Sequence, residues 1–114
     1  IVYPTIGQAA FTFPEVARAG VNPDDVVNDS NYQIKKVSLK YGSLYAGQND
    51  QISTLTLVFK DQQLVGASEI GDYAADDINN FLPIIGLNIN GKEYRQKVMA
   101  IYPTLGDKVA GLLP

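Results

Sequence analysis

Apolar and polar residues alternate most clearly in the middle of the chain, between Asn31 and Ala67. Apolar residues occupy alternate positions from Tyr32 to Tyr41, but the phase changes at Lys35-Lys36, which predicts one long strand with a β-bulge. Ile52 to Phe59 is rich in β-branched and aromatic residues and predicts a second strand. A four-residue turn then leads into a short third strand, Leu64 to Ala67.

Helical patterns flank this strand-rich region. From Asp72 to Leu82 apolar residues recur at helical spacing, and Pro83 ends the segment. Pro14 to Gly20 has proline at the first helical position and glycine just past the end, which predicts one or two helical turns. Asn22 is placed to cap a further short helix.

Asn90-Gly91 separates two segments with strand character, Ile84 to Asn88 and Tyr94 to Tyr102. Asn-Gly supplies the two positive φ angles of a type I′ turn, so the sequence predicts a C-terminal β-hairpin. Together the elements predict an α+β fold, in which an antiparallel β-sheet includes this hairpin and is joined by one or two short helices. An all-β sandwich is the alternative.

The length of 114 residues predicts a single domain, residues 1–114, with extended arms at 1–13 and 102–114. The segment Tyr3 to Gly7 (YPTIG) recurs as Tyr102 to Gly106 (YPTLG), near the other end of the chain. Three explanations of this repeat are open. Both ends pack alike in a subunit contact, the chain is one period of a tandem array, or the match is coincidence. The residues expected to make assembly contacts are Tyr3, Pro4, Ile6, Tyr102, Pro103 and Leu105.

The composition excludes several kinds of catalysis. The chain has no Cys and no His, which removes disulfides, thiol nucleophiles and the usual general base. No P-loop, G-x-S-x-G or G-x-G-x-x-G motif is present. A carboxylate pair is the remaining catalytic alternative, but its candidate acids are scattered: Asp50, Asp61, Glu69 and Glu93. We therefore expect a protein that is not an enzyme and has no cofactor.

Metal and membrane binding are also not expected. The two aspartate clusters lack EF-hand spacing and are typical of helix starts, where the helix dipole favours acids. No apolar run approaches the length of a membrane span. The sequence opens at Ile1 without a leader pattern, which favours a processed or excised chain, and Asn28 begins a formal glycosylation sequon.

Basic residues alternate with apolar ones on two of the predicted strands. Lys36 and Lys40 lie on the first of them, and Arg95 and Lys97 lie on the last hairpin strand. In one sheet these four side chains form a basic stripe that suits a polyanion such as nucleic acid, although the net charge of −3 argues against a dedicated nucleic-acid binder. The alternative is an ordinary solvated sheet face.

A loop from Tyr41 to Asp50 combines two tyrosines with Gly, Ser, Asn and Gln, the composition of adaptable binding loops. Its candidate binding residues are Tyr41, Tyr45 and Asn49, with a carbohydrate or a protein as partner. A connecting loop packed on the sheet edge is the alternative.

The low charged fraction of 18% indicates a surface that a partner covers. We therefore expect a structural subunit that assembles with itself, as a homo-oligomer of the virion coat or extracellular filament type. A secreted or surface binding module is the alternative function. Both functions favour an extracellular or virion location.

Overall fold

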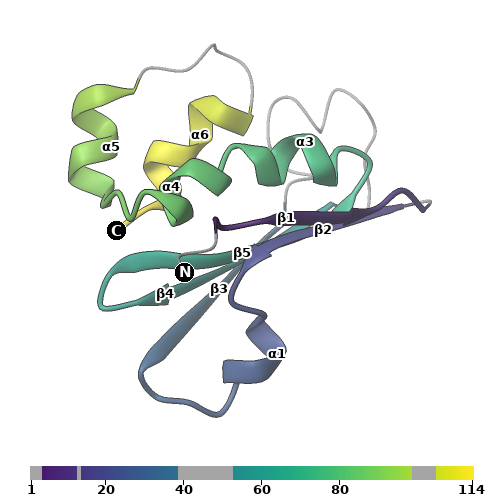
Figure 1. Cartoon of the computed structure of the whole chain (residues 1–114), viewed down its shortest axis with the longest axis horizontal. Coiled ribbons are helices and arrows are strands. Elements are labelled where there is room, and N and C mark those ends of the chain that lie inside the picture. The colour runs from purple at the N-terminus through teal and green to yellow at the C-terminus, as the bar shows by residue number, and fades with distance from the viewer. Residues whose placement is uncertain (1–3, 13, 39–52, 99–104) are drawn as a thin grey trace.

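In the part of the chain that the structure describes, five antiparallel strands form one sheet in the order β1-β2-β5-β4-β3 (Figure 1). The structure is a computed structural model that describes residues 4–12, 14–38, 53–98 and 105–114. The strands are β1 (Gly7–Ala10), β2 (Glu15–Gly20), β3 (Tyr32–Ser38), β4 (Thr54–Lys60) and β5 (Gln63–Gly71). The helices are α1 (Pro23–Val26), α3 (Ala74–Asn79), α4 (Leu82–Gly86), α5 (Gly91–Lys97) and α6 (Leu105–Leu112).

Helices α3 to α6 lie on one side of the sheet, and α1 lies on the other side, at the opposite end of the molecule in Figure 1. This arrangement confirms the expected α+β class with an antiparallel sheet and short helices. The alternative of an all-β sandwich is wrong for the described residues, because helices occupy the place that a second sheet would take.

The core lies between the sheet and the helix layer. On the central strands, alternate residues such as Ala17, Leu55, Leu57 and Ala67 point toward the helices and are buried. The helices contribute the other buried members: Ala74, Ile78, Phe81, Ile84, Tyr94, Val109 and Leu113. Burial raises the pKa of the Tyr94 phenol above its ordinary value, because removal from water disfavours the phenolate.

The chain crosses closely over the sheet where β2 leads into α1. Gly20 ends β2 with a φ of 70°, and the Val21 amide then donates to the Val65 carbonyl at 3.0 Å. A Cβ added at Gly66 would overlap the Val21 carbonyl oxygen. The crossing therefore requires a residue without a side chain at position 66, and it fixes where α1 begins.

The predicted helical turn at Pro14 to Gly20 is wrong, because residues 15–20 form β2. Val16 and Arg18 are exposed while Ala17 and Ala19 are buried, which is the two-residue period of a strand. The predicted bulge at Lys35-Lys36 is also wrong, since β3 pairs with β4 in one uninterrupted register. The irregularity lies instead at Val58/Phe59, in the pairing of β4 with β5.

The predicted Asn90-Gly91 hairpin is not formed. Asn90 is the N-cap of α5, with its side-chain Oδ1 accepting from the Glu93 amide at 2.8 Å. Asparagine suits both a type I′ turn and a helix cap, and here the helix brings Tyr94 into the core. A two-residue hairpin turn does occur between β4 and β5, where Asp61 and Gln62 both have positive φ.

Replacing Asn90 with alanine should lower the free energy of unfolding by about 1 kcal/mol, because the Glu93 amide would lose its acceptor. Urea denaturation followed by circular dichroism measures this loss. The matched control is Asn90→Asp, which keeps the acceptor and adds a charge favoured at a helix start. An equal loss in both variants would contradict a capping role.

Both segments predicted as arms contain regular structure. Gly7–Ala10 is the edge strand β1, paired with β2, and Leu105–Leu112 is helix α6. In the described residues, no helix has the length and apolar character needed to cross a membrane.

Candidate interaction surfaces

The sheet face opposite the helix layer carries a row of polar side chains that crosses all five strands. Cross-strand pairing places Gln8, Arg18, Ser68, Thr56 and Lys36 side by side, in that order from β1 to β3. We call these five residues the polar row. Because neighbouring strands lie about 4.8 Å apart, the row brings groups distant in sequence onto one line.

Apolar residues border the polar row. Val16 and Ile70 are neighbours in the adjacent cross-strand row, and both are exposed. On the other side of the polar row, Ile34 and the exposed Val27 line the same hollow of about 360 Å³ as Arg18 and Lys36. This open face of the sheet therefore combines two cations and two hydroxyls with exposed apolar surface.

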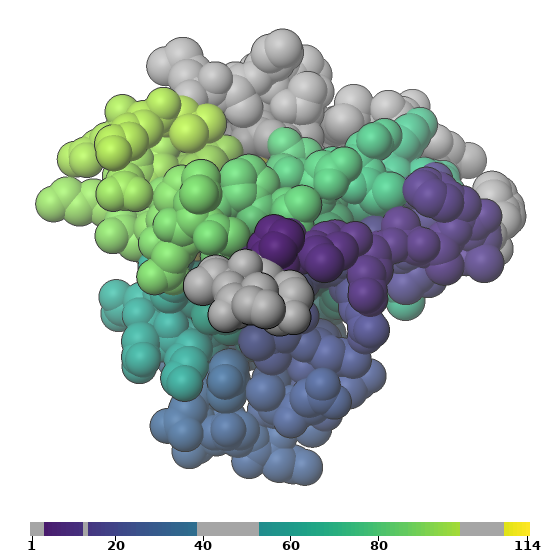
Figure 2. Space-filling model, viewed as in Figure 1, coloured from purple at the N-terminus to yellow at the C-terminus, as the bar shows by residue number. Residues whose placement is uncertain are grey.

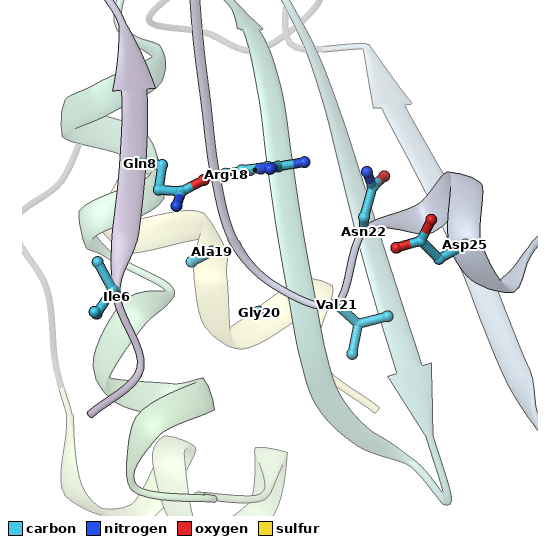
Figure 3. Close-up of a pocket in the computed structure, with 8 residues that line it drawn as sticks. All are labelled: Ile6, Gln8, Arg18, Ala19, Gly20, Val21, Asn22 and Asp25. Atoms are coloured by element: carbon cyan, nitrogen blue, oxygen red, sulfur yellow. Dashed lines mark hydrogen bonds between the residues drawn. The ribbon is translucent and has the colours of Figure 1, made fainter. Parts of the chain in front are cut away.

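Arg18 of β2 extends across this face. Its Nε donates to Oε1 of Gln8 at 3.2 Å, and its guanidinium extends over β5, away from β1 (Figure 3). Three hollows in the described part of the chain, of about 500, 320 and 360 Å³, are each lined in part by Arg18. Figure 3 shows the largest, between β1, β2 and the start of α1, where Asn22 and Asp25 also line the wall.

A second candidate surface lies on the helix layer. The sequence has no Asp, Glu, Lys or Arg from Ile78 to Gly91, a run that includes the end of α3 and all of α4. We call it the uncharged helix surface. Figure 2 shows α3 and α4 within a continuous green band above β1. Its exposed side chains include Asn79, Asn80, Pro83 and Leu87, and Leu87 is 71% exposed.

The structure does not bring the predicted basic stripe together. Lys36 lies on the open face of β3, as part of the polar row, but Arg95 and Lys97 are on α5, in the helix layer. Arg95 donates to the carbonyl oxygens of Ala110, Leu113 and Pro114 at 3.2–3.5 Å, so it holds the end of the chain. Lys40 lies outside the described residues.

The other predicted site residues are separated or undescribed. Pro4 and Ile6 are exposed, and Ile6 lines the hollow of about 500 Å³ shown in Figure 3. Leu105 is the first residue of α6. Tyr3, Tyr102 and Pro103, together with the loop residues Tyr41, Tyr45 and Asn49, lie outside the described residues.

The candidate catalytic acids do not meet either. Asp61 is in the β4–β5 turn, Glu69 is buried in β5 and Glu93 is on α5, whereas Asp50 is outside the described residues. Among the residues that the structure describes, no three acids are grouped closely enough to hold a metal ion.

Arg18 is the residue that sequence reasoning missed. The available signal was the alternation of larger side chains (Val16 and Arg18) with small ones (Ala17 and Ala19). This two-residue period is typical of a strand and places Arg18 on one face of it. Because Pro14 to Gly20 was interpreted as a helix, Arg18 was not placed on a sheet face.

One protein family matches almost the whole chain. Residues 6–112 match the pyridine nucleotide-disulphide oxidoreductase dimerisation domain. An uncharacterised 19.7 kDa protein of a Staphylococcus aureus mercuric resistance operon is 30% identical over 116 residues. That match covers 99% of this chain and 64% of the relative.

Solved structures share the fold at low sequence identity. LpdA from Mycobacterium tuberculosis superposes with a TM-score of 0.81 at 17% identity, over 93% of this chain and 24% of that protein. The HOCl-induced flavoprotein disulfide reductase RclA from Escherichia coli gives a TM-score of 0.78 at 15% identity, over 97% and 26%. The chain thus spans about a quarter of each of these two proteins.

These findings correct the expected function. A virion coat or extracellular filament subunit is wrong, as is the alternative of a secreted or surface binding module, because the family match covers residues 6–112. The same match overturns the extracellular or virion location inferred from those functions. The expected homo-oligomer agrees with the description of the family as a dimerisation domain.

Proposed function

The chain belongs to the dimerisation-domain family of the pyridine nucleotide-disulphide oxidoreductases, and we propose that it pairs with a second copy through the uncharged helix surface. The match over residues 6–112 carries this proposal. Self-association then holds two copies in a fixed two-fold arrangement, and any redox chemistry is carried out by other parts of the assembly.

The charge distribution favours the helix layer over the sheet as the self-association surface. A closed dimer places the same patch of both copies together, so charges near the two-fold axis meet charges of the same sign. The run from Ile78 to Gly91 brings no such repulsion, and interface cores are generally depleted of charged residues. A dimer that used the open face of the sheet would bring Arg18 and Lys36 of one copy near the same cations of the other copy, and these would repel.

The chain's own residues do not fit the redox chemistry in the family's name. It has no cysteine for thiol–disulfide exchange. It also has no G-x-G-x-x-G loop to hold the phosphates of a dinucleotide. We therefore assign any disulfide reduction to other polypeptide, consistent with a chain that spans 64% of its curated relative and about a quarter of LpdA and of RclA.

The proposal is tested by the solution mass of the chain, measured by light scattering over a wide concentration range. We expect twice the chain mass of 12.4 kDa, with monomer appearing only on dilution. Because the proposed surface has no charged side chains, the dimer should be nearly insensitive to salt between about 0.05 and about 1 M. A monomer at every concentration would refute self-association, and dissociation by salt would refute the helix surface.

A further inference from the structure

The open face of the sheet has the properties of a receptor for carboxylates. Gln8 accepts from the Nε of Arg18, which restrains the guanidinium and leaves its two terminal amino groups over β5. A guanidinium held in this way matches the two oxygens of a carboxylate, and less side-chain entropy is lost on binding. The hydroxyl side chains of Ser68 and Thr56 follow in the polar row and supply further donors.

The second cation of the row sets the size of the ligand. Arg18 on β2 and Lys36 on β3 are separated by three inter-strand steps, which is about 14 Å. One small dicarboxylate is too short to reach both cations. An extended polypeptide advances about 3.4 Å per residue, so acids four residues apart span the same distance.

From this match we propose that the open face binds an extended acidic segment of a different polypeptide. The segment crosses the strands along the polar row, with one carboxylate on Arg18 and a second, four residues away, near Lys36. The exposed Val16, Val27 and Ile70 beside the polar row give the segment apolar surface to contact. The proposal goes beyond self-association and uses the opposite side of the sheet.

Other occupants fit this face less well. A second copy would bring the same two cations against the polar row if the two-fold axis passed through it. A continuous polyanion such as nucleic acid would meet the carboxylate of Asp24, which lines the same hollow as Arg18 and Lys36. A segment of a different polypeptide does not repeat the two cations, and its two separated carboxylates bring less negative charge near Asp24 than a continuous polyanion does.

The test uses the 114-residue chain and a labelled probe peptide, acetyl-Glu-Val-Ser-Val-Glu-amide, by fluorescence polarisation and amide chemical shifts. We expect shifts on β2, β5, β4 and β3 and weaker binding at high salt. Arg18→Gln should weaken binding about tenfold or more, and Lys36→Gln about threefold. Lys92→Gln, an exposed lysine on α5, is the matched control and should leave affinity unchanged.

Several results would overturn the proposal. A probe with both Glu replaced by Gln, or with the acids two residues apart, should bind more weakly; equal affinity contradicts carboxylate recognition or the spacing. Glutarate binding as tightly as the peptide would assign the face to small anions, and preferred binding of single-stranded DNA would assign it to a polyanion. Because Arg18 and Lys36 are exposed, their variants should fold normally, and solution mass reports self-association independently.

Discussion

Replacing Gly66 with alanine should lower the free energy of unfolding by about 3 kcal/mol, a large share of the stability of a domain of this size. The added methyl group would overlap the Val21 carbonyl oxygen, which is main chain and has no rotamer to change. Moving Val21 away would also break its amide hydrogen bond to Val65. Urea denaturation at neutral pH measures the loss.

Gly111→Ala is the matched control for this prediction. An added Cβ at Gly111 has no neighbour within 4 Å, and the residue lies in helix α6. Alanine is favoured over glycine in helices by up to about 1 kcal/mol, so this variant should be neutral or slightly more stable. A similarly small effect at Gly66 would mean that the β2–α1 segment does not cross the sheet as closely as described.

Sequence patterns predicted the central strands better than the ends of the sheet. The apolar run at Ile52 to Phe59 falls largely within β4, and the alternation predicted from Tyr32 to Tyr41 includes all of β3, with residues 39–41 outside the described part of the chain. These strands are identifiable because β-branched and aromatic residues fit a half-buried pleated surface. Pro14 to Gly20 was misassigned because proline followed by glycine also frames a helix, while the alternating burial that marks β2 depends on tertiary contacts.

The candidate surfaces were less predictable than the fold, for two physical reasons. The polar row depends on strand order, since Arg18 and Lys36 lie on one line only because β5 and β4 join β2 to β3. The Asn90-Gly91 pair suits two conformations, and the choice of a helix moves Arg95 and Lys97 from the sheet to the helix layer. The predicted basic stripe therefore placed Lys36 on a sheet face correctly, but it grouped Lys36 with Arg95 and Lys97, which lie on α5.

Replacing Leu87 with aspartate should weaken self-association about 100-fold or more. Leu87 is 71% exposed at the end of α4, so the change should cost the monomer little stability. In a closed dimer the substitution occurs twice, and each copy would bury an unpaired carboxylate in a surface that has no cation between Ile78 and Gly91. Light scattering and sedimentation at several concentrations measure the shift toward monomer.

Phe11→Asp is the matched control for this prediction. It distinguishes loss of a specific interface from a general effect of losing exposed apolar surface. Phe11 is 78% exposed, as large and as accessible as Leu87, but it lies between β1 and β2, away from α4 (Figure 1). If self-association uses the uncharged helix surface, Phe11→Asp should remain dimeric where Leu87→Asp is monomeric. The reverse pattern would move the interface to the β1–β2 end of the sheet, and equal weakening by both variants would indicate nonspecific apolar association.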